Sequence, residues 1–298
     1  NIEVLPAMSK AFNPYYTMYP EDERAVHAYY YDAWAHYRMG KWRDASKVFE
    51  NLATNFPGSR YASEALFRAG DALFNMTNRG GSGDKGQAFL DAMAFYDRLV
   101  ERYPRSSHVD DALYNKAWCL INLERTEEAV PVFEQIVTEH AEGTYGPRSQ
   151  FTLGDYYYGL KEYDKARESY QAFLDRFPAD KLTAQDRALP RKAKTLLGHL
   201  GEIDAYNLYS AGEKLFDEKN YDEAVKIFKE VQQKYPQSDQ AVNSLVNIAA
   251  AHMAQEEYRE AGAIFQKVVD NYGDNPKYLP QVDFAKQQLE AMQEARVL

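Results

Sequence analysis

Apolar and polar positions along this chain follow the spacing of an α-helix, in short segments that come in pairs. The clearest pair covers residues 151–178. Its first segment places Leu153 and Tyr157 on one face, and its second segment does the same with Ala166 and Tyr170. Residues three or four apart lie on one side of a helix, so each segment predicts a helix with one apolar stripe. Two such helices cannot bury both stripes by themselves, and the pattern therefore predicts a repeated unit.

The repeat is marked by a small residue, an aromatic residue at +4, an apolar residue at +7 and, in four copies, Pro at +12. The marks begin at six alanines: Ala45, Ala92, Ala129, Ala166, Ala224 and Ala261. Four of the five gaps follow from a period of 37 residues, alone or with an insertion of 10, and the fifth is 37 plus 21. Another small residue lies in the preceding segment of each copy: Ala33, Gly70, Ala117, Gly154, Gly212 and Ala249. A fixed period of this length indicates stacked helical hairpins.

This arrangement resembles the tetratricopeptide repeat, a helix–turn–helix unit with small residues, an aromatic and a closing proline at these relative positions. The resemblance covers residues 25–272. It implies an all-α fold, a right-handed α-solenoid of about six hairpins with two insertions and a C-terminal capping helix. Three linkers have the order aromatic, Pro, any residue, Ser, beginning at Phe56, Tyr103 and Tyr235. Together with residues 103–129, they are similar to tetratricopeptide proteins of bacterial cell envelopes, such as the TolA-binding periplasmic protein and the BamD outer-membrane lipoprotein.

The pattern divides the chain into consecutive parts. Residues 1–24 carry Pro6, Pro14 and Pro20, so we expect an irregular segment without a long regular helix. The repeat marks continue weakly through this segment, which is alternatively the tail of an upstream repeat. The other parts are repeats one to four at 25–178 with a loop insertion at 77–86, an inserted basic and helical segment at 179–204, repeats five and six at 205–272, and a linker with a capping helix at 273–298.

The two insertions carry the motifs that could indicate another function. In the first, Gly81, Gly83 and Gly86 have the spacing of a dinucleotide-binding loop, but that motif requires a preceding strand and here helices are expected on both sides. A flexible loop is therefore the preferred interpretation. The second predicts an extra or lengthened helix, because apolar residues keep helical spacing after Pro190. Its basic residues are either a solvated face or a secondary contact with an acidic partner or lipid headgroup, through Arg187, Arg191, Lys192 and Lys194.

Composition and motifs argue against several functional classes. A net charge of −10 and a pI near 5.2 disfavour nucleic acid as a partner. No apolar run is long enough to span a membrane. Cys119 is the single cysteine, and no motif of a hydrolase, nucleotide-binding enzyme or metalloprotease is present. His108 with Asp110 and Asp111 could hold a metal, but a solvated linker is the preferred interpretation. We therefore expect no enzyme activity, no cofactor and no metal.

The candidate site is a surface formed by the first helices of the hairpins. The resemblance implies that the fifth and twelfth residues of each repeat point into a concave groove. Trp34 and Trp118 lie between them at the ninth position, and Arg38 adds a cation beside the first aromatic cluster. Aromatic rings at these positions either bind a partner or pack against neighbouring helices. The full predicted groove comprises Tyr30, Trp34, Tyr37, Arg38, Phe67, Phe74, Tyr114, Trp118, Phe151, Tyr158, Tyr209 and Phe216.

These observations predict a non-catalytic scaffold that binds a segment of another protein in its groove. The envelope resemblance implies a multiprotein assembly in bacterial envelope assembly and a location in the periplasm or cell envelope, with the cytoplasm as the alternative. Two other functions stay open: a carbohydrate-binding module for exopolysaccharide or peptidoglycan, and the docking arm of a larger multidomain protein. Because the chain starts at Asn1 rather than Met, we expect it to be processed or cut from something longer.

Overall fold

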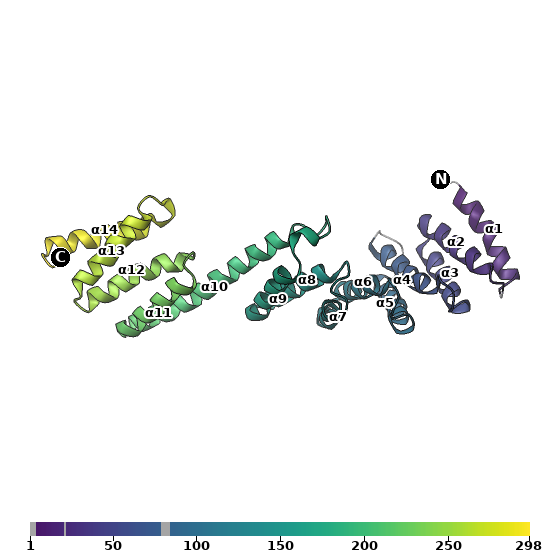
Figure 1. Ribbon diagram of the computed structural model, residues 1–298, viewed down its shortest axis with the longest axis horizontal. Coiled ribbons are helices and arrows are strands. Elements are labelled where there is room, and N and C mark those ends of the chain that lie inside the picture. The colour runs from purple at the N-terminus through teal and green to yellow at the C-terminus, as the bar shows by residue number, and fades with distance from the viewer. Residues whose placement is uncertain (1–3, 21, 79–83) are drawn as a thin grey trace. The chain divides into compact units, whose positions relative to one another are not determined.

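A computed structural model describes residues 4–20, 22–78 and 84–298. Within these residues the chain forms 14 α-helices and no strand. Contacts divide it into two compact units, Asn1–Pro190 and Arg191–Leu298. In each unit, most consecutive helices lie side by side and are joined by short turns (Figure 1). None of the described helices is both long enough and apolar enough to cross a membrane.

The first unit is a stack in which each helix packs against the next one along the chain. Its helices are α1 (Leu5–Met18), α2 (Ala25–Arg38), α3 (Trp42–Asn55), α4 (Ala62–Asn78), α5 (Lys85–Arg102), α6 (Val109–Asn122), α7 (Thr126–Glu139), α8 (Gly146–Gly159) and α9 (Tyr163–Arg176). The second unit repeats this arrangement with α11 (Tyr221–Lys234), α12 (Asp239–Ala254), α13 (Tyr258–Tyr272) and α14 (Leu279–Glu294), after α10 (Leu189–Asp217). Contact mainly between neighbours defines a solenoid, so the prediction of an all-α solenoid of helical hairpins is confirmed.

The expectation of an irregular segment over residues 1–24 is wrong, because Leu5–Met18 form the regular helix α1. Pro6 lies in the first turn, where the N–H it lacks would have no helical partner. Pro14 lies inside the helix and removes one hydrogen bond. Packing of an apolar face against α2, with Tyr16 buried, stabilises the helix despite that loss. The interpretation of this segment as the tail of an upstream repeat stays a prediction.

The two predicted insertions differ in how much of them the structure describes. In the first, at 77–86, residues 79–83 lie outside the described residues, and with them Gly81 and Gly83. The described flanks are helical, because α4 continues to Asn78 and α5 begins at Lys85. The second insertion contains a 3-10 turn at Ala179–Lys181 and then the first half of α10, one helix of 29 residues. The added residues thus lengthen the first helix of the fifth hairpin.

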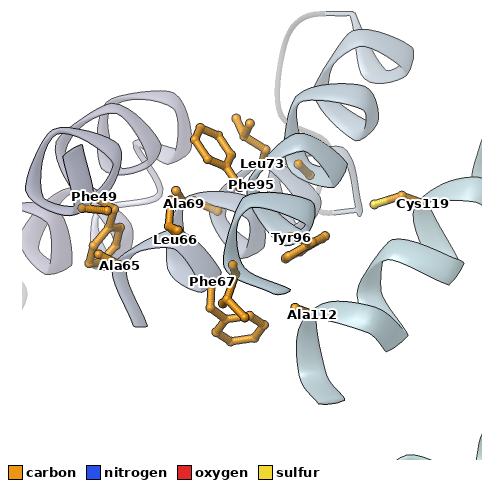
Figure 2. Packing of buried hydrophobic residues seen from close by; sticks show 14 of the residues in the cluster. Phe49, Ala65, Leu66, Phe67, Ala69, Leu73, Phe95, Tyr96, Ala112 and Cys119 are labelled. Atoms are coloured by element: carbon orange, nitrogen blue, oxygen red, sulfur yellow. The ribbon is translucent and has the colours of Figure 1, made fainter. Parts of the chain in front are cut away.

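Small residues set the distance between the two helices of a hairpin. A Cβ atom added at Gly154 of α8 would lie 2.5 Å from the ring of Tyr170 on α9. Gly70 and Gly212 are equally close, at 2.6 Å, to the ring that faces them. The six alanines that mark the repeat lie on the second helix of each hairpin and are fully buried. Figure 2 shows the resulting cluster in the first unit, to which α3, α4, α5 and α6 all contribute side chains.

Cys119 lies in this core, on α6, and is fully buried. Burial raises the pKa of its thiol to about 12. The thiolate is the reactive form of cysteine, and the raised pKa lowers the thiolate fraction roughly a thousandfold. We therefore expect Cys119 to react with Ellman's reagent near pH 8 at least about a hundredfold more slowly in the folded protein than in guanidinium-unfolded protein. Absorbance of the released thionitrobenzoate measures both rates. Equal rates would show that Cys119 is accessible.

Candidate functional site

The fifth-position aromatics pack inside and between hairpins. In five hairpins each ring lies within 5.4–6.4 Å, centroid to centroid, of the aromatic marking the second helix. Three of them also contact a ring at the start of the next hairpin: Tyr30 on Tyr61 at 4.5 Å, Phe67 on His108 at 5.2 Å and Tyr114 on Tyr145 at 4.1 Å. Phe67, Phe151 and Tyr209 are buried. At this position the predicted groove residues therefore stabilise the stack.

The twelfth-position aromatics close the turn of each hairpin. Their rings contact the first aromatic residue of the second helix, with centroid distances of 5.0–6.0 Å. These pairs are Tyr37 with Trp42, Phe74 with Phe89, Tyr158 with Tyr163 and Phe216 with Tyr221. Each of the four predicted residues is half-buried. The aromatic residues at the twelfth position are therefore explained by packing within each hairpin.

The ninth-position tryptophans belong to neither of these two rows. Trp34 on α2 and Trp118 on α6 are both half-buried and lie outside the two packed rows. Trp34 meets the rings of Tyr30, Tyr37 and Phe49 edge to face, at 5.2–6.3 Å. Trp118 makes one such contact, with the ring on the preceding turn of its helix. The two tryptophans come from the first and third hairpins, so they form two patches and not a continuous ladder.

An arginine that sequence analysis missed covers Trp34. The guanidinium carbon of Arg68, on α4, lies 5.0 Å from the ring centroid of Trp34, within the range of a cation–π interaction. The same guanidinium lies 3.7 Å from Glu64 and 3.5 Å from Asp71. Tyr30 donates to Glu64 at 3.2 Å and Tyr37 to Asp71 at 2.6 Å. Three contacts thus join α2 to α4: the Trp34–Arg68 pair and the two tyrosine–carboxylate hydrogen bonds. In each of them the partners are 34 residues apart in the sequence.

A pocket of about 450 Å³ opens between α1 and α2. Its lining consists of Leu5, Met8, Tyr30, Tyr31, Trp34, Ala35 and Arg38. The walls are apolar or aromatic apart from Arg38, which is exposed. Within the described part of the chain, Arg38 forms no ion pair. The aromatic wall was predicted from the sequence, but the pocket was not, because the opposite wall belongs to the helix that the prolines seemed to exclude.

The basic segment is exposed, as far as the structure describes its surroundings. Arg187 precedes α10, and Arg191, Lys192 and Lys194 lie in its first turns. Cations there are unfavourable beside the partial positive charge of a helix N-terminus. The nearby Asp186 does not balance them, because it is buried and paired with Arg148. A secondary contact with an acidic partner or lipid headgroup therefore stays a prediction for this segment.

The residues considered for a metal do not converge. His108 stacks on Phe67, and its Nδ1 lies 3.9 Å from Asp111. Asp110 pairs instead with Nδ1 of His140, at 2.8 Å. Across residues 4–20, 22–78 and 84–298 no group of three His, Cys, Asp or Glu side chains could hold a metal ion. The half-buried His108 is a packing residue, where a solvated linker had been expected.

Buried tyrosines make stability sensitive to high pH. Burial first, and then the hydrogen bond to Asp155, raises the pKa of Tyr170 above its usual value of 10.0, and burial likewise raises that of Tyr209. A hydroxyl with a raised folded-state pKa stabilises the fold fully below about pH 10 and loses that contribution as the pH rises further. We therefore expect the free energy of unfolding, from urea titrations, to fall steadily above about pH 10. Tyr170→Phe should show a shallower fall, and an identical slope would contradict the assignment.

Comparison with known proteins places these hairpins in a family. Sequence profiles of the tetratricopeptide repeat match residues 32–107, residues 111–142 with 148–180, and residues 215–279, together more than half of the chain. No curated protein matches the sequence.

Three solved structures are among those that a structural comparison finds similar to this chain. MamA (41-end) from Desulfovibrio magneticus RS-1 is 15% identical, with 84% of this chain and 97% of that chain covered and a TM-score of 0.39. A tetratricopeptide repeat protein from Parabacteroides merdae ATCC 43184 is 15% identical, with 90% and 98% covered and a TM-score of 0.42. PilF of Pseudomonas aeruginosa is 14% identical, with 92% and 98% covered and a TM-score of 0.38.

Proposed function

The chain belongs to the tetratricopeptide repeat family, and from this premise we propose that it is a non-catalytic scaffold that binds a segment of another protein on its first-helix surface. The observation that carries the proposal is the half-buried aromatic cluster around Trp34 on α2, with a pocket beside it. Large amphipathic rings held rigidly at a surface are the side chains that dominate protein–protein binding. The rigidity here comes from Arg68 and from the hydrogen bonds of the flanking tyrosines.

The binding residues in this proposal are fewer than the twelve predicted from the sequence. The fifth- and twelfth-position rings already have partners within the stack, so their removal would damage the fold before it affected binding. Trp34, Trp118 and Arg38 keep surface that the stack does not use. We assign partner binding to these three residues, with Tyr30 and Tyr37 holding Trp34 in place.

We further propose a role in a multiprotein assembly of the bacterial envelope, in the periplasm or cell envelope. The support is the linker order aromatic, Pro, any residue, Ser, which occurs at Phe56, Tyr103 and Tyr235. A cytoplasmic location is the alternative, and fractionation of the native host with an antibody to this chain distinguishes the two. The docking-arm alternative concerns sequence beyond this chain and is tested by reading the full-length gene.

Carbohydrate binding is less well supported by the geometry. Sugar rings stack on open aromatic faces, whereas Arg68 lies over the ring of Trp34. Binding to purified peptidoglycan that persists in high salt and is lost in Trp34→Ala would nevertheless favour the carbohydrate function. We expect no such binding above that of an unrelated helical protein.

Affinity capture from fractions of the native host tests the scaffold proposal. The baits are the wild-type chain, a Trp34→Ala, Trp118→Ala variant, and Tyr206→Ala as a control that removes an exposed ring, 58% accessible, from α10. Circular dichroism establishes that all three remain helical. We expect one protein to be retained by the wild type and the control and lost from the double variant. Equal retention by all three would place binding elsewhere on the molecule and contradict the proposed site.

A further inference from the structure

The pocket between α1 and α2 has one rigid wall and one adaptable wall. On α2, Tyr30 is fixed by contacts with Tyr61 and Glu64, and Trp34 is fixed by Arg68. A wall whose rings are already ordered loses little entropy when a ligand binds. On α1, the unbranched side chain of Met8 can adopt several shapes against a ligand. This combination suits an inserted apolar side chain, and the volume of about 450 Å³ lies within the usual range of ligand pockets.

The charged residue in the lining of the pocket is a cation, although the whole chain is acidic. Arg38 lines the pocket and is unpaired within the described residues. Two other cations close in sequence, Arg43 and Lys47, line a separate pocket together with Glu50 and Asp91. The nearest carboxylates on α4 are already engaged by Arg68 and by the tyrosine hydroxyls. An approaching carboxylate would therefore find a guanidinium that no described residue engages.

We propose that this pocket takes a large apolar side chain of a partner protein, and that Arg38 binds an Asp or Glu carboxylate adjacent to it in the partner sequence. The inference rests on the proposed scaffold function and adds the chemistry of the recognised segment. The pocket supplies affinity by burying the apolar side chain. The guanidinium supplies selectivity for acidic neighbours, because a bidentate pair with a carboxylate is stronger and more directional than one with a neutral amide.

Selection from a library of random dodecapeptides displayed on phage tests the inference on the full chain. Peptides retained by the wild type should be enriched in Leu, Phe or Trp next to Asp or Glu. On Arg38→Glu the apolar preference should persist while the flanking preference changes to Lys or Arg. Tyr31→Ala, which removes an exposed part of the pocket wall, should weaken binding of a selected synthetic peptide about tenfold, a loss of about 1.4 kcal/mol. Arg259→Glu, which changes an exposed cation on α13 outside the pocket, is the matched control and should change neither.

The outcomes separate this inference from the scaffold proposal. Peptides that are enriched on the wild type but bind equally to Arg38→Glu and Tyr31→Ala would overturn the pocket assignment, while loss of the same peptides in Trp118→Ala would keep the scaffold function. Enrichment of apolar residues next to basic residues on the wild type would also overturn it. No enrichment above the bare support on any bait, together with equal capture of host proteins by all baits, would contradict both proposals.

Discussion

Replacing Gly154 by alanine lowers the free energy of unfolding by about 1–3 kcal/mol, the usual cost of overpacking a filled interior. The new methyl group would meet three ring atoms of Tyr170 at 2.5–3.0 Å, closer than real Cβ contacts. The ring cannot move aside freely, because it is fully buried and its hydroxyl donates to Asp155 at 2.6 Å. The result is notable because alanine is otherwise the better helix former, by about 0.5–1 kcal/mol.

The same substitution has the opposite effect at Gly198, which is the matched control. A Cβ atom there meets nothing within 4 Å, and the residue lies inside α10. Gly198→Ala should therefore raise the free energy of unfolding by about 0.5–1 kcal/mol. Guanidinium titrations measure both values, and hydrogen exchange should place the loss at Gly154 in the amides of α8 and α9. If the Gly154→Ala variant had the same free energy of unfolding as the wild type, α8 and α9 could move apart without cost and the prediction would be wrong.

Tyr16→Phe is expected to loosen α1 from the rest of the first unit. Asp32 on α2 is fully buried, and its carboxylate accepts a 2.6 Å hydrogen bond from the Tyr16 hydroxyl. Its other oxygen lies 3.4 Å from Nε2 of His36 and has no hydrogen bond in the described structure. Without the hydroxyl, a fully buried carboxyl group loses its hydrogen bond from Tyr16, which costs about 1–3 kcal/mol. We expect that loss to fall mainly on the α1–α2 contact.

Hydrogen exchange distinguishes this local effect from general instability. Amides of α1 should exchange at least about tenfold faster in Tyr16→Phe, which corresponds to about 1.4 kcal/mol of local stability, while those of α12 stay unchanged. Tyr19→Phe, which removes a hydroxyl from a ring 54% exposed, is the control. Because Leu5 and Met8 of α1 line the pocket, the same variant should weaken peptide binding there. Unchanged protection of α1 would show that the Tyr16–Asp32 hydrogen bond does not hold the helix.

The hairpins could be predicted because each of their marks has a direct steric meaning. Gly154 faces a buried ring, and Ala166 is itself fully buried against the neighbouring helix. The N-terminal helix was missed because the argument from Pro14 was given more weight than the apolar spacing of the same residues. A proline inside a helix removes one hydrogen bond, and burial of one helix face can outweigh that loss.

The site was predicted only in part, because sequence position does not reveal what a side chain already contacts. Aromatic residues at the fifth position, such as Tyr114, were predicted to line a groove. The structure shows instead that the ring of Tyr145, from the next hairpin, stacks on Tyr114. Arg68 of the second hairpin lies over Trp34 of the first hairpin. Their separation of 34 residues differs from the repeat period of 37. Neither contact follows from the pattern within one helix. They depend on how far successive hairpins are rotated, which a single sequence does not specify.

The neighbour-to-neighbour contacts also bear on the order in which the chain can fold. Side-chain hydrogen bonds join neighbouring hairpins over short stretches of sequence, as between Arg98 and Glu50, which are 48 residues apart. Such local contacts close small loops and favour fast folding. The first two hairpins can thus form the Tyr30–Glu64 and Tyr37–Asp71 hydrogen bonds without waiting for α10. Aromatic segments that could aggregate in an unfolded chain would therefore be covered as soon as the next hairpin along the chain is available to pack.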